Sequence, residues 1–255
     1  MLKDFLLGNK HLQPFYEFLF KVAYKGMNYD RGHVPDLSGE KYVLKLLEKN
    51  SREKSLNIFD VGANVGQYAQ LVLSTIKMPI QLYSFEPQPA AYAKLIKACD
   101  KDFFHPNNMA LGSKAGTEKM FYNNQGSVFA SMFPAKYETY SIDLNQQQEV
   151  KVSTLDDYCI ANNITRIDFL KMDVEGYEME VLKGAKQLLA QKVIKMVQFE
   201  FGIASIEARI YLKDFFTTLD GFDIYRILQN GIRKLHYSEY IEIFSPTNYL
   251  AILKD

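Results

Sequence analysis

The segment that most constrains the fold runs from Ile58 to Tyr68 and reads Ile-Phe-Asp-Val-Gly-Ala-Asn-Val-Gly-Gln-Tyr. An apolar run ends at an acid, a turn with two glycines follows, and a helix-like pattern begins. This order is typical of a buried parallel strand that turns tightly into a helix and leaves bare backbone where a nucleotide-like ligand can lie. The sequence therefore predicts an α/β fold with a ligand site at Gly62 and Gly66.

A second apolar segment ends in one acid, Glu86, which stands 20 residues after Gly66 and directly before Pro87. In folds of this class, an acid at the end of the next strand binds the hydroxyls of a ribose. We therefore expect Glu86 to hold a ribose.

The spacing of the turn indicates which cofactor is bound. A dinucleotide site has the pattern Gly-x-Gly-x-x-Gly, whose middle glycine lies against the pyrophosphate. Here Asn64 stands in place of that glycine, and the last glycine comes one residue early. Asp60 would repel a phosphate but suits an ammonium group. A ligand with a ribose, an amino-acid tail and no phosphate is S-adenosylmethionine. A nicotinamide-dependent oxidoreductase, a module that binds the cofactor without catalysis, and a purely structural turn stay open as alternatives.

Composition sets outer limits on class and partners. The 255 residues are 47% hydrophobic, enough for a full core, and the 30 basic residues equal the 30 acidic ones. That balance gives no net field for a nucleic-acid partner, and no run reaches the ~18 apolar residues of a membrane span. Cys99 and Cys159 are not spaced like the cysteines of a disulfide pair or of a metal site. We expect a cytoplasmic protein that acts on a small-molecule or glycan acceptor. The sequence is also compatible with a homo-oligomer.

Strand and helix patterns alternate along most of the chain, which predicts a mostly parallel sheet of seven strands with helices on both faces, a Rossmann-like architecture. We expect residues 1–50 to form an N-terminal helical extension or lid and residues 51–255 to form the main domain. The expected strands are 57–61, 80–85, 103–110, 167–172, 194–199, 222–228 and 249–253, and the expected helices of the main domain are 67–76, 89–98, 177–190 and 205–219. A hairpin is expected at 229–231, and residues 112–154 read as a β insertion between the third and fourth strands, near the ligand edge.

A second group of acids follows the fourth expected strand. Asp173 interrupts an apolar run, and Glu200 ends the next strand in the same way. Adjacent parallel strands end at one edge of a sheet, so both carboxylates should face one cleft. Glu175 and Glu178 fit the solvated first turn of a helix, where carboxylates suit the helix dipole.

Five ordered motifs resemble the FkbM-type methyltransferases over about residues 38–201. They are Asp60–Gly66, Phe85–Pro87, Asn108–Gly112, Thr154–Asp157 and Ile167–Glu178. The resemblance implies a class I S-adenosylmethionine-dependent fold and O-methylation of a sugar or polyketide hydroxyl. The residues before 38 and after 202 match no motif of that family.

The resemblance also implies roles for individual residues. It places four residues of the turn around the amino-acid tail, Glu86 on the ribose, and two residues beside the adenine, with a third ligand loop at 108–112. The strand order, in which the fourth strand adjoins the first, separately points Asp173 at the methionine end of the cofactor. Together these arguments predict nine cofactor-binding residues: Asp60, Gly62, Asn64, Gly66, Glu86, Pro87, Asn108, Ala110 and Asp173.

Methyl transfer to an alcohol needs a group that removes the hydroxyl proton. Asp173 is the first candidate and Glu200 the second. With a third oxygen they could instead hold a divalent ion of the Mg²⁺ type, but the sequence fixes no third ligand, and we assign no metal ligand. His33 and His236 are further candidate bases.

Overall fold

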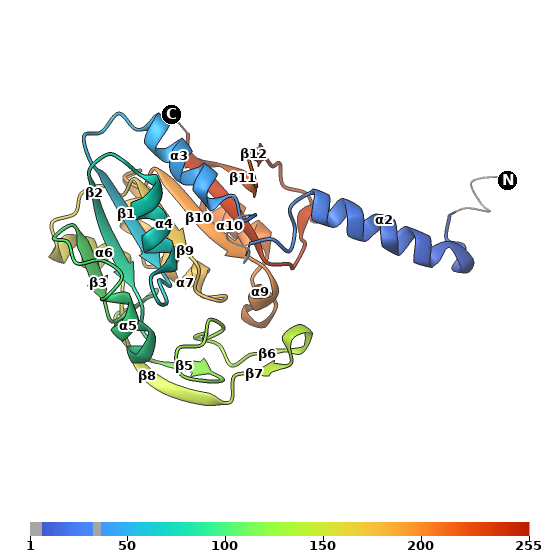
Figure 1. Cartoon of the computed structure of the whole chain (residues 1–255), viewed down its shortest axis with the longest axis horizontal. Helices are drawn as coiled ribbons and strands as arrows, with labels where there is room; N and C mark the ends of the chain where they lie inside the picture. The colour runs from blue at the N-terminus through green and yellow to red at the C-terminus, as the bar shows by residue number, and fades with distance from the viewer. Residues whose placement is uncertain (1–6, 33–36, 255) are drawn as a thin grey trace.

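A computed structural model describes residues 7–32 and 37–254 of the chain. Its centre is a sheet with strand order β3-β2-β1-β9-β10-β13-β11-β12 (Figure 1). The first five of these strands in space run parallel, and β13, β11 and β12 pair antiparallel. The strands are β1 (Leu56–Val61), β2 (Ile80–Phe85), β3 (Phe104–Asn107), β9 (Phe169–Met172), β10 (Met196–Phe201), β11 (Phe222–Leu228), β12 (Gly231–Lys234) and β13 (Thr247–Leu253).

This sheet confirms the predicted α/β class. It has the class I methyltransferase arrangement, in which the last strand of the sequence, here β13, runs antiparallel between β10 and β11. It contains eight described strands instead of the seven expected. The additional strand is β12, which is the return strand of the expected hairpin and pairs with β11 at the edge of the sheet.

Alternating side chains along the strands fill two separate cores. In β1, Leu56 and Ile58 pack on the face covered by α3 (Glu40–Asn50), α4 (Gln67–Thr75) and α5 (Pro89–Leu95). Phe59 and Val61 pack on the opposite face, because successive side chains of a strand point to opposite sides. That face is covered by α6 (Leu155–Ala161), α7 (Glu178–Lys183), α8 (Lys186–Ala190) and α10 (Leu212–Thr218).

Two expected helices are interrupted. The helix expected at 177–190 divides into α7 and α8, and the one expected at 205–219 divides into α9 (Ile203–Ala208) and α10. Arg209 ends α9 in the left-handed conformation, with φ of 55°. Helix α6, absent from the expected elements, begins where the Thr154 side chain accepts the backbone N–H of Asp157. Hydrophobic periodicity continues across such breaks and does not reveal them.

The predicted β insertion is present as two small sheets beside the main one (Figure 1). The first contains β4 (Ala110–Leu111), β8 (Gln146–Ser153) and β5 (Gly116–Tyr122), and the second contains β6 (Lys136–Tyr137) and β7 (Ile142–Asp143). The single strand expected at 103–110 is wrong. β3 ends at Asn107, and Ala110 belongs to the insertion, where it pairs with Val152. The chain leaves the main sheet there because the Asn108 amide turns back to the carbonyls of Glu86 and Pro87.

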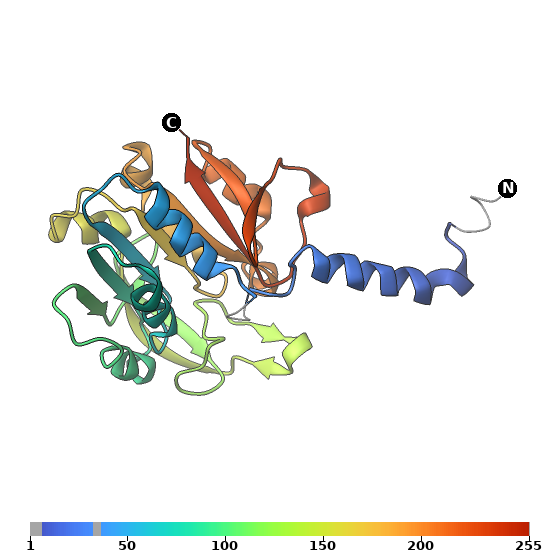
Figure 2. The same cartoon turned by 45° about the horizontal axis from the view of Figure 1, so that its top comes forward.

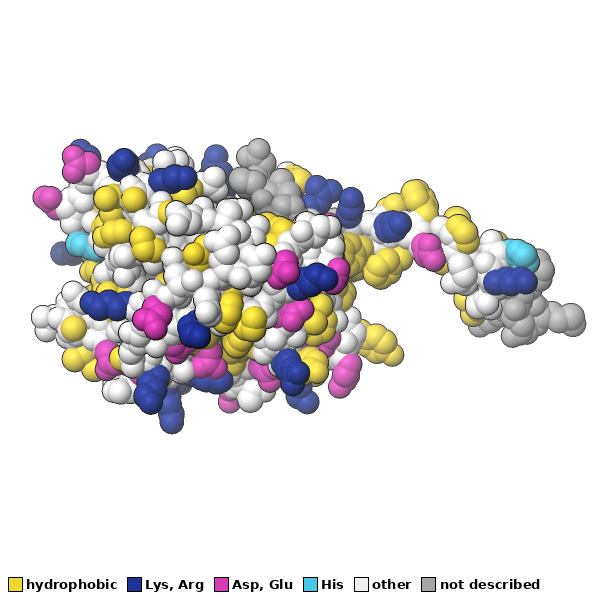
Figure 3. Space-filling view, turned by 90° about the horizontal axis from the view of Figure 1, so that it is seen from below, with side chains coloured by type: hydrophobic (Ala, Val, Ile, Leu, Met, Phe, Trp, Pro, Cys, Tyr) yellow, Lys and Arg dark blue, Asp and Glu magenta, His cyan; other side chains and the backbone are white. Residues whose placement is uncertain are grey.

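The two N-terminal helices, α2 and α3, differ in how much of their surface is buried against the rest of the chain. Helix α2 (Gln13–Gly26), preceded by the short helix η1 (Lys10–Leu12), extends away from the body (Figures 1 and 2) and has no buried residue. Figure 3 shows hydrophobic side chains spread along it. Helix α3 instead buries Val43, Leu44 and Leu47 in the core beside α4. Among the described residues, no helix combines the length and the apolar character that crossing a membrane requires.

Candidate active site

A cavity of about 850 Å³ lies at the carboxyl ends of β1, β2, β9 and β10. Its floor is made by the turn after β1, the loop after β2 and the loop between β9 and α7. The β insertion contributes its other side through residues 127–130, Met132 and two tyrosines, Tyr137 and Tyr140. This is the edge where the sequence predicts the ligand, because loops after parallel strands gather there.

The two glycines of the turn are required by contacts within the protein. Gly62 has φ of +85°, and a Cβ built on it would lie 1.8 Å from the backbone oxygen of Asp173. Gly66 has φ of +90°, and its Cβ would lie 2.7 Å from the Cβ of Ala98. Gly62 lines the cavity and Gly66 is not among the lining residues. A side chain at Gly62 is therefore excluded by the backbone after β9, which already fills that space.

Glu86 joins the turn after β1 to the loop after β2. Its Oε2 accepts the backbone N–H of Asn64 at 2.9 Å, and its Oε1 accepts that of Gln88 at 2.8 Å. The side chain lines the cavity but is only 3% exposed. Burial raises the pKa of Glu86 to about 7, although both N–H donors act to lower it. Each oxygen keeps a lone pair for a ligand hydroxyl.

The other residues expected at the nucleoside end fall into two groups. Pro87 and Ala110 line the cavity, as does Asn64. Asn108 is not among the lining residues, and its amide braces the loop after β2 from behind. Gln88, which the sequence analysis missed, donates to the carbonyl of Ser127 and accepts the N–H of Gly126. It thereby fixes part of the insertion over the cavity.

Asp60 lies below the turn and is fully buried. Its neighbour on β9 is Lys171, and the Lys171 Nζ to Asp60 Oδ1 distance is 3.5 Å. Burial raises the pKa of Asp60, and Lys171 opposes that rise. Asp60 is not among the cavity-lining residues. Its carboxylate therefore does not reach the cavity, where the expected direct contact with a ligand ammonium would have to form. The charge of Asp60 instead holds Lys171.

Lys171 lines the cavity and is a candidate site residue that the sequence patterns did not reveal. Its ammonium also lies 3.3 Å from Asp173 Oδ2 and 4.8 Å from the centre of the Tyr68 ring. Burial acts to lower the pKa of Lys171, but Asp173, Asp60 and Glu40 together raise it above its usual range. The signal in the sequence was a lysine inside the apolar run of residues 169–172, because a buried lysine requires paired acids.

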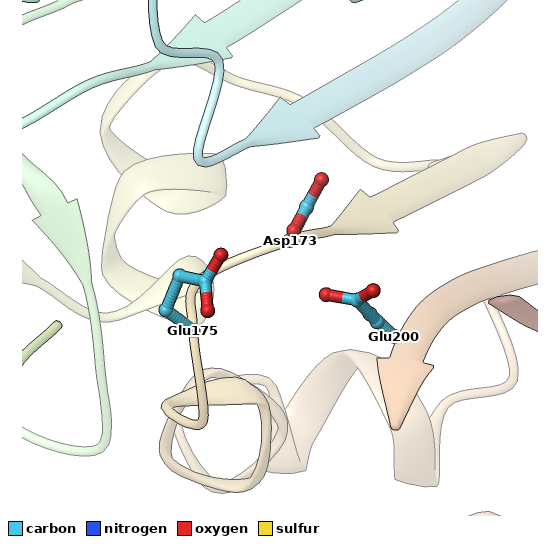
Figure 4. A group of neighbouring side chains, drawn as sticks. All are labelled: Asp173, Glu175 and Glu200. Atoms are coloured by element: carbon cyan, nitrogen blue, oxygen red, sulfur yellow. The ribbon is translucent and has the colours of Figure 1, made fainter. Parts of the chain in front are cut away.

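Asp173 and Glu200 lie together in the cavity, as the order of the strands predicts, and Glu175 joins them (Figure 4). One carboxylate oxygen from each of the three lies within 4.8 Å of the others. Asp173 follows β9 directly, Glu175 lies in the loop after it, and Glu200 is near the end of β10. The three carboxylates point toward one another across the space between these strand ends.

The expectation that Glu175 and Glu178 lie in a solvated helical turn is wrong. Glu175 precedes α7, has φ of 51° and lines the cavity. Glu178 begins α7 but is 2% exposed, and its Oε1 accepts the N–H groups of Val174 and Gly176. Burial raises the pKa of Glu178 to about 7.

Neighbouring carboxylates also raise the pKa of Glu175 and the pKa of Glu200. Burial raises the pKa of Glu175 well above its usual range, and the charges of Glu200 and Asp173 raise it further. The pKa of Glu200 is raised by burial and then by Asp173 and Glu178. Like charges held this close favour bound protons or a bound cation.

None of the histidines in the described part of the chain lines the cavity. His236 is exposed and is not among the lining residues, and His105 contacts Gln81 instead. His33 lies outside the described residues, although Gly32 beside it lines the cavity.

The sequence of the chain matches a known methyltransferase family. The sequence signature described as Methyltransferase FkbM domain matches residues 60–220. The chain belongs to this family. The resemblance drawn from the sequence motifs is thereby confirmed, and the matched region of this FkbM-family chain contains the turn, Glu86 and all three clustered carboxylates.

Three relatives of this FkbM-family chain are methyltransferases by name. Hexuronic acid methyltransferase AglP of Haloferax volcanii is 26% identical over 171 residues, which are 67% of this chain and 66% of AglP. The 2-O-methyltransferase NoeI of Sinorhizobium fredii is 24% identical and aligns over 79% of this chain and 85% of NoeI. The 31-O-demethyl-FK506 methyltransferase FkbM of Streptomyces tacrolimicus is 23% identical over 51% of this chain and 59% of its own. The chain thus spans slightly less than two thirds of AglP.

Solved structures with a similar arrangement are more distant. The plantazolicin methyltransferase BpumL in complex with SAH has a TM-score of 0.42 and 12% identity, and covers 90% of this chain and 89% of its own. A putative rRNA-methylase from Clostridium thermocellum has a TM-score of 0.43 and 8% identity, and covers 85% of this chain and 98% of its own.

Proposed function

We propose that this chain is an S-adenosylmethionine-dependent O-methyltransferase that acts on a hydroxyl of a sugar, glycan or polyketide-like acceptor. The observation that carries the proposal is the placement of two acids, Asp173 and Glu200, in the same cavity as the glycine turn and Glu86. The cavity thereby combines features suited to a nucleoside with groups able to accept a proton.

Glu86 is proposed to bind both ribose hydroxyls of the cofactor. Its two oxygens are fixed by backbone N–H groups, so the carboxylate is already oriented before the ligand arrives. Pro87 and Ala110 would lie beside the adenine, and the backbone of the turn from Gly62 to Asn64 would face the amino-acid tail. Family membership favours this cofactor over a nicotinamide.

The proposed reaction is an in-line displacement at the methyl carbon. The acceptor oxygen forms the new bond to carbon, the bond from carbon to the sulfonium sulfur breaks, and its electron pair stays on sulfur as a neutral thioether. The hydroxyl proton passes to a carboxylate. Asp173 is already paired with Lys171 at 3.3 Å, which leaves Glu200 as the more available acceptor. Alignment of the two reacting groups supplies much of the acceleration.

The acceptor class is supported by the relatives and by the cavity. The names of NoeI and FkbM specify methylation at oxygen, and that of AglP specifies a hexuronic acid. In this chain the side of the cavity formed by the insertion carries Tyr137, Tyr140 and Phe129. Aromatic faces beside carboxylates suit a sugar ring, which has apolar faces and polar edges.

The test is methyl transfer from labelled S-adenosylmethionine to a panel of uronic acids, other sugars, glycans and polyketides, with cofactor binding measured separately by calorimetry. Label should appear on an acceptor oxygen. Binding of NAD in place of S-adenosylmethionine would contradict the proposal and support the oxidoreductase. Binding without transfer to any acceptor would support a non-catalytic module.

A further inference from the structure

Two of the three clustered carboxylates, Glu175 and Glu200, have no ion-pair partner within the described part of the chain, whereas the third, Asp173, is paired with Lys171. Lys171 contacts Asp173 and Asp60. Within residues 7–32 and 37–254, no hydrogen bond or ion pair joins the carboxylate of Glu175 or of Glu200 to another side chain. Figure 4 shows both carboxylates directed at the same space as Asp173.

The surrounding elements add more negative charge. Helix α3 contributes Glu40, whose carboxylate accepts the Gln198 amide at 3.1 Å, and α7 contributes Glu178. The ionisable acids and bases along the cavity, within the described part of the chain, are six carboxylates and one ammonium: Glu40, Glu86, Asp173, Glu175, Glu178, Glu200 and Lys171. A cavity this acidic attracts a cation.

A buried hydroxyl across the cavity gives an independent indication of a missing ligand. Tyr137 on β6 lines the cavity and is 2% exposed. Its Oη has no hydrogen-bond partner among the described residues. Burial raises the pKa of Tyr137, and the charge that raises it most is that of Glu175. A buried hydroxyl without a partner is costly, and it would be satisfied by a bound water or an acceptor oxygen at the carboxylates.

The loop that carries Glu175 is held in place by the insertion. The Ser131 hydroxyl donates to the backbone oxygen of Glu175 at 2.7 Å. Glu175 has φ of 51° and Gly176 has φ of 94°. Residues other than glycine rarely adopt a left-handed backbone, and when they do they are often at functional sites. The backbone here turns the Glu175 side chain into the cavity.

We propose that Asp173, Glu175 and Glu200 bind one divalent cation of the Mg²⁺ or Mn²⁺ type, with the Tyr137 hydroxyl hydrogen-bonded to one of its remaining water or acceptor ligands. Three carboxylate oxygens without nitrogen or sulfur ligands suit these hard cations, which keep several waters. Binding of the ion is independent of the activity proposed above. Its use in catalysis, to stabilise the negative charge that develops on the acceptor oxygen, rests on that activity.

Mn²⁺ binding to the full chain, measured by electron paramagnetic resonance with and without S-adenosylhomocysteine, tests the proposal. The wild type should bind one ion, and Mg²⁺ should compete for it. Glu175→Gln should weaken binding on the order of tenfold to a hundredfold or more, since changes merely adjacent to ligands already cost that much. Glu149→Gln is the matched control, because Glu149 is exposed on β8 and is not a cavity-lining residue.

Thermal unfolding gives a second readout that detects a folding defect. In EDTA, Glu175→Gln should melt above the wild type because one of three repelling carboxylates is gone. At one Mn²⁺ concentration, the rise in melting temperature should be large and equal for the wild type and Glu149→Gln and clearly smaller for Glu175→Gln. Absence of Mn²⁺ binding by the wild type, or equal binding by Glu175→Gln, would overturn the proposal. If calorimetry shows that the wild type does not bind S-adenosylhomocysteine, the methyltransferase proposal is contradicted instead, and the proposed ion site is unaffected.

Discussion

Lys171 and Asp60 face each other on adjacent parallel strands, with 3.5 Å between the ammonium nitrogen and the nearer carboxylate oxygen, and both side chains are almost completely buried. This pair lies directly under the glycine turn. It connects the stability of the fold to the position of Asp173, which the same ammonium contacts.

Replacing one partner of this pair should be strongly destabilising. Lys171→Met leaves the Asp60 carboxylate buried without a counter-charge, a loss of about 3–5 kcal/mol in the free energy of unfolding. Urea denaturation measures it. The double variant Lys171→Met, Asp60→Leu should recover most of the loss, because an apolar pair replaces the ion pair. Lys119→Met, at an exposed position on β5, should have little effect. A single variant as stable as the wild type would show that the pair does not hold the sheet.

The affinity for S-adenosylmethionine should depend on pH through Glu86. Its pKa in the folded protein is raised to about 7, so the free carboxyl holds a proton below that pH, whereas ribose hydroxyls require an acceptor. Affinity should therefore fall by up to about tenfold for each pH unit below 7. The free energy of unfolding should change in the opposite sense. The folded state binds this proton more tightly than the unfolded state does, so the contribution of Glu86 to stability decreases as pH rises from 4.5 to 7.

Calorimetry across pH 5.5–8 checks this dependence. Glu86→Gln should lower affinity at pH 8 by roughly tenfold to a hundredfold, the value of a charge-assisted hydrogen bond, and should flatten the pH profile. Because Glu86 also accepts two backbone N–H groups, the melting temperature must be measured alongside. A profile that keeps its slope in Glu86→Gln would assign the proton to another group, with Glu178 tested next.

Gly62→Ala should damage the fold as well as the site. The added Cβ would lie 1.8 Å from the Asp173 backbone oxygen and φ is +85°, so β1 or the loop after β9 must move. We expect a loss of more than about 2 kcal/mol in urea denaturation. Gly126→Ala is the matched control, because Gly126 has φ of +76° and nothing within 4 Å of its Cβ. It should cost only the backbone strain, about 1–2 kcal/mol. Equal losses in both would mean that the contact with Asp173 is unimportant.

Turnover should depend on the two carboxylates more than folding does. Asp173→Asn and Glu200→Gln should each lower kcat by ~10²–10⁴-fold, either as the usual contribution of a positioned proton acceptor or through loss of the proposed ion, and both variants should remain folded by circular dichroism. Steady-state assays measure this effect with the acceptor that the panel of sugars, glycans and polyketides identifies. Glu149→Gln is the control. Full activity in both variants would exclude these two groups from the chemistry, and His33 and Tyr137 would be examined next.

Local residue patterns were enough to predict several elements of the fold. The strand at 80–85 and the strand at 222–228 match β2 and β11 at both ends, because strand alternation and flanking turn residues are read over a few positions. The glycine turn, Glu86 after β2, and the joint position of Asp173 and Glu200 followed in the same way from strand ends that share one edge.

The groups that those residues contact could not be predicted from local patterns, because they come from distant parts of the chain. The contact that forbids a side chain at Gly62 comes from Asp173, and the charge that faces Asp60 comes from Lys171, both more than one hundred residues away in the chain. Glu175 reads as a helical residue because charge near a helix start is common, yet its left-handed backbone and its place beside Glu200 depend on the loop held by Ser131. Long-range contacts leave no periodic pattern in the sequence, so the third carboxylate of the cluster became visible only when the sheet was assembled.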